Sequence, residues 1–296
     1  METVWRALLL SWGWRAEVIL PLILFGAVFS LGWARLFARQ QRGLAAGWRL
    51  ICYWLGIGVV ALALMSPIDL LGTQLFTAHM IQHLLLVMIA PPLLLLAQPF
   101  PFLLWGLPRG LRRRIGGLFS RKSAVRLWLT RLTRPLGVWL ASMVILWGWH
   151  IPSAYEAALR SDFIHDLEHL SFFGSGMLFW WSVTAVGPRL QGQAGRGTRI
   201  VFLLVTVPVN VLLSMLIALA DQPLYPHYTT VPRLWGLSVL QDQMFGGAIM
   251  WVPGSMMYVV AASILLFRLF QTEGRADGSD QEMGDDRASP LDVKQV

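Results

Sequence analysis

The histidines of this chain are few, and two pairs of them have a spacing that could bind a metal ion. The six histidines are His79, His83, His150, His165, His169 and His227. In HMIQH (79–83) and in HDLEH (165–169), two imidazoles lie four residues apart. Because residues four apart share a helical face, each pair could reach one ion. Imidazole suits zinc and copper, and an added thioether shifts the preference towards Cu(I).

Carboxylates and thioethers accompany these histidines in the sequence. Met80 lies inside the first pair and Glu168 inside the second. Asp242, Gly246 and Met250 are spaced by four residues, so they form one stripe of a helix in which Gly246 would let a neighbouring helix approach closely. The candidate metal ligands are therefore His79, His83, His150, His165, His169, Asp242, Met250, Met80 and Glu168. His227 carries less weight.

Each candidate has an alternative interpretation as part of the fold. A histidine within a membrane helix can hydrogen-bond to a neighbouring helix, but two HxxxH pairs at one level favour metal binding. Methionine is ordinary packing material in a bundle, and this role is favoured for Met80 and Met250. Asp242 is equally well explained as a helix N-cap.

HDLEH also matches H-x-x-E-H, the signature of inverzincin metalloproteases, in which Glu168 would be a general base. The third carboxylate ligand that such an enzyme needs cannot be identified on a downstream helix. We therefore expect a protein that is not an enzyme and assign no catalytic residue. The intramembrane zinc metallohydrolase stays as an alternative.

The composition indicates that membrane helices position these residues. The 296-residue chain is 56% apolar and only 14% charged, which leaves too little polar surface for a water-soluble globule. Apolar stretches of about 20 residues can each cross a bilayer. The prediction is an all-α integral membrane protein with seven transmembrane helices, at about 16–37, 48–66, 77–98, 135–151, 162–187, 199–220 and 240–270. They form one domain, 1–270, followed by a disordered acidic cytoplasmic tail, 271–296.

The basic residues predict the orientation of this bundle. The links 35–49, 99–134 and 188–199 and the tail from 268 hold 4, 9, 3 and 4 of the 24 basic residues. Basic links face the cytoplasm, so the N-terminus is expected outside and the C-terminus inside. All six histidines then lie towards the outer face, with carboxylates such as Asp69 and Glu168. The net charge of +8 reflects this topology rather than nucleic-acid binding.

Two further features concern the ends and surroundings of the bundle. The N-terminus, METVWRALLLSWGW, lacks a basic n-region and an A-x-A-like cleavage site, so no cleaved signal peptide is expected. The link 99–134 mixes arginine with large apolar residues, which predicts that it lies on the inner leaflet against anionic lipid.

Four ordered segments resemble a known family. They are HMIQHLLLVMIAPPLLLLAQP, WGWHIPSAYEAAL, HDLEHLSFFGSGMLFWW and DQMFGGAIMWVPG. Together they resemble the seven-helix CtaG proteins, which are linked to assembly of caa-type cytochrome c oxidase, over roughly residues 50–265. A single-span copper chaperone that shares this name relies on cysteines. Cys52 is the only cysteine here, so the seven-helix family is meant.

The resemblance implies a role in maturing a haem-copper oxidase in the bacterial cell (inner) membrane. We expect the protein to bind copper, as Cu(I), at an outer-face His/Met site and to deliver it to the oxidase. The expected partners are haem-copper oxidase subunits, a periplasmic copper chaperone and membrane lipid. The alternatives are a copper transporter, the zinc metallohydrolase and a haem-binding electron carrier.

Overall fold

The computed structural model describes residues 11–120, 123–186 and 195–288, and every regular element in these ranges is a helix. The all-α class predicted from the sequence is therefore confirmed for this part of the chain. The longer helices are α2 (Ala16–Ala38), α3 (Gly47–Met65), α10 (Pro135–Trp149), α12 (Asp162–Thr184), α13 (Arg196–Ala218) and α15 (Val239–Ala288). The shorter ones are α4 (Pro67–Gly72), α5 (Phe76–Leu84), the π-helix η1 (Leu85–Ile89), α6 (Ala90–Leu96), α7 (Pro99–Gly106), α8 (Arg109–Leu118), α9 (Ala124–Leu132), α11 (Pro152–Arg160) and α14 (His227–Thr230).

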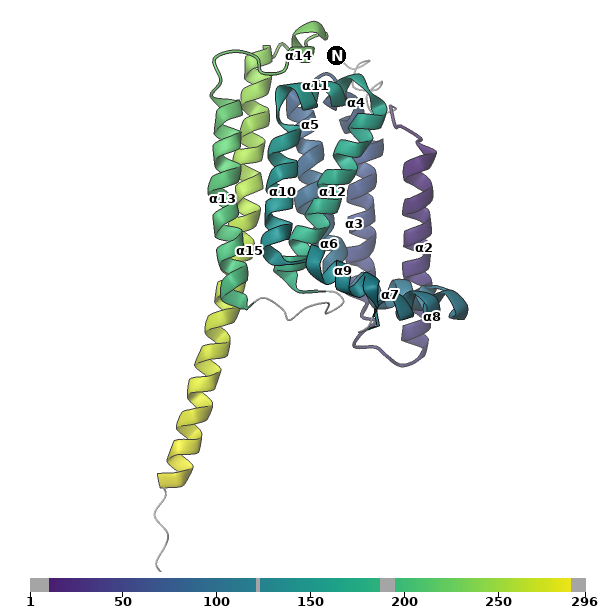
Figure 1. Cartoon of the computed structure of the whole chain (residues 1–296), viewed down its shortest axis with the longest axis vertical. Helices are drawn as coiled ribbons and strands as arrows, with labels where there is room; N and C mark the ends of the chain where they lie inside the picture. The colour runs from purple at the N-terminus through teal and green to yellow at the C-terminus, as the bar shows by residue number, and fades with distance from the viewer. Residues whose placement is uncertain (1–10, 121–122, 187–194, 289–296) are drawn as a thin grey trace, which may run out of the picture.

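The long helices stand side by side around one central rod (Figure 1). This rod is the continuous segment Phe76–Leu96, made of α5, η1 and α6. Of its most apolar 18-residue stretch, 56% is buried. It contacts α3 on one side and α12 and α15 on others. The short helices α4, α11 and α14 gather at one end of the bundle, and α7, α8 and α9 at the other (Figure 1).

Five or six of the described helices qualify as membrane spans. Five are long and apolar enough by themselves: Ala16–Ala38, Gly47–Met65, Phe76–Leu96, Arg196–Ala218 and Val239–Gln271. α10 is long and apolar enough to cross a membrane only together with α11, from which it is bent by 72°. α12 has 23 residues, but histidines and acidic residues occupy its first turns. The seventh span and the orientation of the termini stay predictions.

Two prolines fix the register between the central rod and α12. The carbonyl of Val87 would normally accept a hydrogen bond from the N–H of residue 91, or of residue 92 in a π-helix. Both positions are proline and have no N–H. Trp180 of α12 supplies the missing donor, with its Nε1 atom 2.8 Å from the Val87 carbonyl oxygen. This bond ties α12 to the central rod at η1.

Small side chains and one amide set the position of α15. A Cβ atom at Gly246 would lie 2.2 Å from the ring of Phe76 and 3.3 Å from Met80, so α15 crosses α5 in very close contact. The close approach predicted from Gly246 is thus present. Asn210 of α13 donates to the Met250 carbonyl oxygen at 2.9 Å, which ties α13 to α15.

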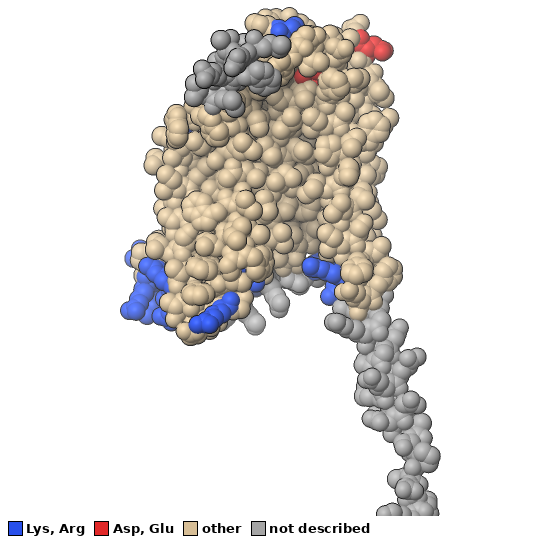
Figure 2. Space-filling view, turned by 180° about the vertical axis from the view of Figure 1, so that it is seen from behind, with Lys and Arg blue, Asp and Glu red and all other residues tan. Residues whose placement is uncertain are grey.

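The charged side chains on the face in Figure 2 gather at the two ends, with Lys and Arg mainly at the end of α7, α8 and α9. The band between the ends shows neither sign of charge on this face. Such a band is what a bilayer core would cover.

α15 runs to Ala288, and the part of it that is apolar enough to cross a membrane is Val239–Gln271. The domain boundary at 270 and the disordered tail from 271 stay predictions. Residues 289–296 of the predicted tail lie outside the described residues.

Candidate metal centre

Four side chains from two helices converge on one point. α5 contributes His79 and His83, whose Nε2 atoms are 2.9 Å apart. α12 contributes Glu168, whose oxygens lie 3.5 Å from Nε2 of His79 and 3.6 Å from Nε2 of His83. With His169, these residues each offer one ligand atom within 4.8 Å of all the others. Ligand atoms about 2.0 Å from a tetrahedral ion are about 3.3 Å apart, which is close to the 2.9–3.6 Å separations among His79, His83 and Glu168. These four residues are called the inner group below.

The inner group is buried, and many of its polar atoms have no partner. His79 and Glu168 are 0% exposed, His169 is 3% exposed and His83 is 6% exposed. Both carboxylate oxygens of Glu168, both ring nitrogens of His169, and Nδ1 of His79 and of His83 lack a hydrogen-bond partner among the described residues. Burying a carboxylate without a partner is costly, and a cation would remove that cost.

A second candidate group shares His169 with the first. Asp69, His165 and His169 also offer ligand atoms within 4.8 Å of one another, and we call them the outer group. Asp69 lies on α4, and Gln82 donates to its Oδ1 atom at 2.7 Å. Asp69 and His165 are partly exposed, unlike the inner group.

Sequence reasoning placed Asp69 among the outer carboxylates but did not identify it as a ligand. A local signal was present. Ser66 before Pro67 is a helix start, and its Oγ accepts from the Ile68 N–H at 3.2 Å. This start makes α4 a short helix ahead of α5, and its end lies against His79, because a Cβ at Gly72 would come within 3.5 Å of the His79 Cα atom.

His150 is oriented like a metal-binding histidine at the end of α10. Its Nδ1 atom lies 2.6 Å from the Leu146 carbonyl oxygen, which can only accept, so Nδ1 carries the proton. Nε2 is then the nitrogen with a free lone pair, and it is buried and unpartnered among the described residues. Tyr225 donates to the His150 carbonyl oxygen at 3.1 Å. The His150 ring centroid is 6.2 Å from that of His83, so His150 adjoins the inner group without belonging to it.

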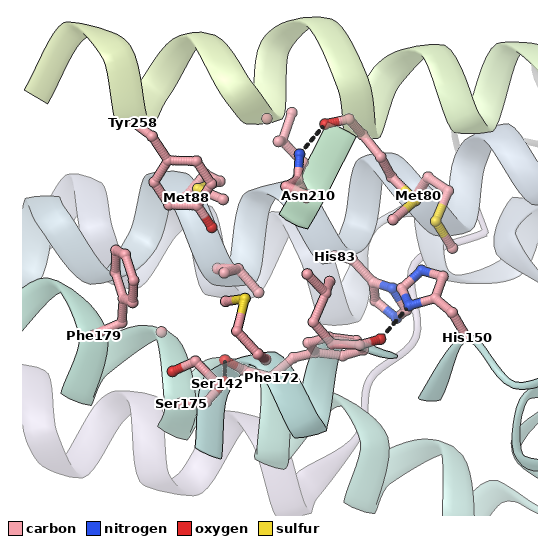
Figure 3. A pocket seen from close by; sticks show the side chains of 17 residues that line it. Met80, His83, Met88, Ser142, His150, Phe172, Ser175, Phe179, Asn210 and Tyr258 are labelled. Atoms are coloured by element: carbon pink, nitrogen blue, oxygen red, sulfur yellow. Dashed lines mark hydrogen bonds between the residues drawn. The ribbon is translucent and has the colours of Figure 1, made fainter. Parts of the chain in front are cut away.

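A cavity of about 60 Å³ begins beside His83 and His150 and runs deeper into the bundle. Figure 3 shows these two histidines and Met80 at one end of it and Tyr258 at the other. The methionines that line it are Met80, Met88, Met143 and Met250. The two methionines named as candidate ligands from the sequence, Met80 and Met250, thus line the same cavity as His83, together with two that the sequence did not single out.

The structure does not bring Asp242 to either group. Its carboxylate accepts from the Phe76 N–H at 2.9 Å and from the Thr77 N–H at 3.0 Å. Arg233 approaches the same carboxylate at 3.4 Å. Asp242 thus caps the N-terminus of α5 from a neighbouring helix, and it positions His79 one turn further on rather than binding an ion.

Paired side chains close the end of the bundle that carries α4, α11 and α14 (Figure 1). The N–H of Nε2 in His227 donates to the Thr73 carbonyl oxygen at 2.9 Å, so this partly exposed histidine lies outside the centre. The Tyr228 hydroxyl donates to the Gly72 carbonyl oxygen at 2.9 Å, and burial raises the pKa of this phenol well above 10. A hydrogen bond to Asp166 raises the pKa of Arg15, which precedes α2, so Arg15 stays charged.

Comparison with known proteins identifies one matching family. Cytochrome c oxidase caa3 assembly factors match residues 27–272. Uncharacterized proteins of Mycobacterium bovis and Mycobacterium tuberculosis are each 26% identical over 239 residues, which is 76% of this chain and 35% of theirs. A Mycobacterium leprae protein is 24% identical over 81% of this chain and 37% of its own. The chain thus spans little more than a third of these relatives. No solved structure is significantly similar to it.

Proposed function

The chain belongs to the family of cytochrome c oxidase caa3 assembly factors, and from this premise we propose that it binds copper and delivers it to a haem-copper oxidase. The inner group holds the ion. The cargo leaves when ligands of the oxidase replace those of the inner group one at a time. Copper is the substrate of this delivery and undergoes no redox step in it.

The buried carboxylate of Glu168, which accepts no hydrogen bond from any described residue, is the observation that carries this proposal. A structural carboxylate at this depth would be paired, as Asp242 is with two backbone N–H groups. Glu168 instead faces two imidazole nitrogens at 3.5 and 3.6 Å. Three neutral imidazoles and one carboxylate form a ligand set of charge −1, which compensates one monovalent cation.

The ligand types support copper, although imidazole and carboxylate also suit zinc. The cavity beside His83 and His150 is lined by four methionines, and thioethers favour Cu(I) over zinc. An ion that moves between the inner group and His150 would meet thioether sulfur next. The family description adds a cytochrome c oxidase as the destination, and haem-copper oxidases need copper to mature.

The direction of delivery rests on the orientation predicted from the basic residues. The short helices next to both metal groups lie at the end opposite α8 and α9 (Figure 1). We expect membrane-impermeant labels to reach a cysteine in the α11 segment 152–160 from outside, and a cysteine at residue 115 only from the cytoplasm. Labelling of residue 115 from outside would reverse the orientation and refute delivery on the outer side.

A zinc metallohydrolase is the second candidate, because the outer group supplies the carboxylate ligand that HDLEH alone lacks. Asp69 would join His165 and His169 as the ligands, with Glu168 as the base. Glu168 is fully buried and faces His79 and His83, which suits a ligand better than a base that must reach water. A Glu168→Gln protein that keeps copper and oxidase assembly but loses a peptidase activity would favour the hydrolase.

The test of copper delivery compares two histidines in otherwise equal cells. His169→Ala should abolish high-affinity copper binding by the purified protein and leave the host oxidase short of copper. His227→Ala is the matched control, because His227 contacts Thr73 outside both groups and should keep both properties. Fully metallated oxidase in cells with His169→Ala would contradict the proposal.

A further inference from the structure

The two metal groups are not two separate sites, because they share His169. It lies in the inner group and in the outer group, and both of its ring nitrogens are buried without a partner among the described residues. Within the inner group, His79 and His83 each pair one ring nitrogen, with each other, whereas His169 pairs neither of its nitrogens with a described residue. A histidine that serves one site normally fixes its second nitrogen with a carbonyl or carboxylate. His150 shows that arrangement with Leu146 in this same chain.

The two groups differ in how easily an ion from outside can reach them. Asp69 and His165 of the outer group are partly exposed, whereas His79 and Glu168 of the inner group are 0% exposed. The outer group is therefore the first set of ligands that an ion meets on its way to the inner group.

The distance between the groups is short enough for a direct exchange of ligands. The His165 ring centroid is 4.1 Å from that of His169 and 5.3 Å from that of His79. An ion that remains bound to His169 could leave His165 and reach His79 without passing through free solution. Each step replaces one coordinate bond by another, and the ion stays Cu(I).

The chemistry of one imidazole limits how many ions the two groups hold together. A neutral imidazole has one nitrogen with a lone pair, and the other carries a proton. His169 can therefore ligate one ion at a time in its neutral form, and a change of tautomer or a ring flip turns its lone pair from one group to the other.

We propose that a single copper ion is loaded through the outer group and passed by His169 to the inner group. This inference rests on the proposed copper binding and adds the route of loading. Asp69 and His165 then govern how fast the ion arrives, whereas the inner group governs how tightly it is held.

The experiment uses the full-length protein in detergent and Cu(I) offered as a coloured bathocuproine disulfonate complex. Stopped-flow absorbance follows the transfer of Cu(I) to the protein, and equilibrium titration gives stoichiometry and affinity. The variants are Asp69→Asn and His165→Ala. Asparagine keeps an oxygen that can accept from Gln82, so Asp69→Asn removes the charge with little change in packing. Asp162→Asn, at the exposed start of the same α12, is the control for charge alone.

The proposal expects one Cu(I) per chain in the wild type and in all three variants, with similar affinities. Loading should be slowed at least about ten-fold by Asp69→Asn and by His165→Ala, the lower limit of usual effects around metal sites. Asp162→Asn should load at the wild-type rate. If both Asp69→Asn and His165→Ala load Cu(I) at the wild-type rate, the loading route is overturned, whereas the proposed copper binding is not. If the wild-type chain binds two ions and His165→Ala loses one of them, the proposal of a single transferred ion is wrong and the two groups are independent sites. A wild type that binds no Cu(I) would overturn the proposed function as well.

Discussion

Buried polar side chains make hydrogen bonds in one part of the bundle and lack them, among the described residues, in another. Those that line the deeper part of the cavity are paired: Ser142 with the Val138 carbonyl oxygen at 2.9 Å, Ser175 with that of Phe172 at 3.0 Å, and Asn210 with that of Met250 at 2.9 Å. The inner group leaves both oxygens of Glu168 and both nitrogens of His169 unpaired among the described residues.

This difference separates residues that hold the bundle together from residues that await a ligand. A hydroxyl or amide that donates to a carbonyl oxygen within a membrane bundle contributes to stability, because its donor is satisfied inside the protein. An unpaired buried carboxylate destabilises the metal-free protein, so its cost is offset only when a cation binds. Among the described residues that line the deeper cavity, the polar groups are hydroxyls and one amide, which suit copper less well than imidazole, and this disfavours a transporter.

The largest expected effect comes from removing both ligands of α5. A four-ligand metal site contributes about 10–16 kcal/mol, or roughly 3 kcal/mol per ligand, so two lost ligands predict at least a ~1,000-fold weaker site. We expect His79→Ala combined with His83→Ala to lose Cu(I) in competition titrations while the protein still folds. A double variant with wild-type affinity would show that the unpaired atoms do not bind the ion.

Glu168→Gln should separate stability from binding. Removing the buried charge should raise the free energy of unfolding of the metal-free protein by about 1–3 kcal/mol. The same change should weaken the binding of Cu(I) by about 10- to 100-fold, because an amide oxygen is a poorer ligand than a carboxylate. Thermal unfolding with and without Cu(I) measures both. A lower stability without the metal would mean that Glu168 has a structural partner, and the contrast between the two depths would be lost.

Gly246→Leu tests the packing that supports the inner group without touching a ligand. A side chain there meets the ring of Phe76. The backbone N–H of Phe76, at the start of α5, is capped by Asp242. We expect lower thermal stability and about ten-fold weaker Cu(I) binding, because small displacements of supporting residues have effects of this size. Unchanged copper affinity in a folded Gly246→Leu protein would show that α15 does not position the inner group.

The smallest effect on copper should follow from a change among the paired groups. Asn210→Leu removes the bond to the Met250 carbonyl oxygen and one to Ser255 at 3.1 Å. Bonds of this kind are worth about 0.6 kcal/mol each in a membrane protein, so the unfolding free energy should fall by roughly 1 kcal/mol. Cu(I) affinity should stay within about two-fold. A large loss of copper would mean that the deeper groups take part in binding.

Most helix positions could be predicted because apolar length alone determines them. The central rod was expected at 77–98 and runs from Phe76 to Leu96. Its π-helix could not be foreseen, because Pro91 and Pro92 only remove donors, and the compensating donor, Trp180, comes from a distant helix. The bend between α10 and α11, by contrast, falls at Ile151, whose extended backbone precedes Pro152 at the start of α11.

The candidate site was predictable where spacing within one helix carries the information. Both HxxxH pairs and Glu168 occupy the positions that their helical spacing implies. The sequence left Asp242 between a ligand and an N-cap, because the backbone N–H groups it caps belong to α5, 165 residues away in the chain. Asp69 was overlooked for the same reason, since only the packing of α4 against α5 brings it to His165 and His169.

X-ray absorption at the copper edge of the Cu(I)-loaded full-length protein tests the central claim most directly. The account predicts a first shell of two or three imidazole nitrogens, with their characteristic outer-shell scattering and at most one thioether sulfur from the adjoining cavity. His227→Ala should leave this spectrum unchanged, and His169→Ala should remove imidazole scattering or the ion itself. A first shell without imidazole, or a protein that retains no copper after removal of excess Cu(I), would contradict the account.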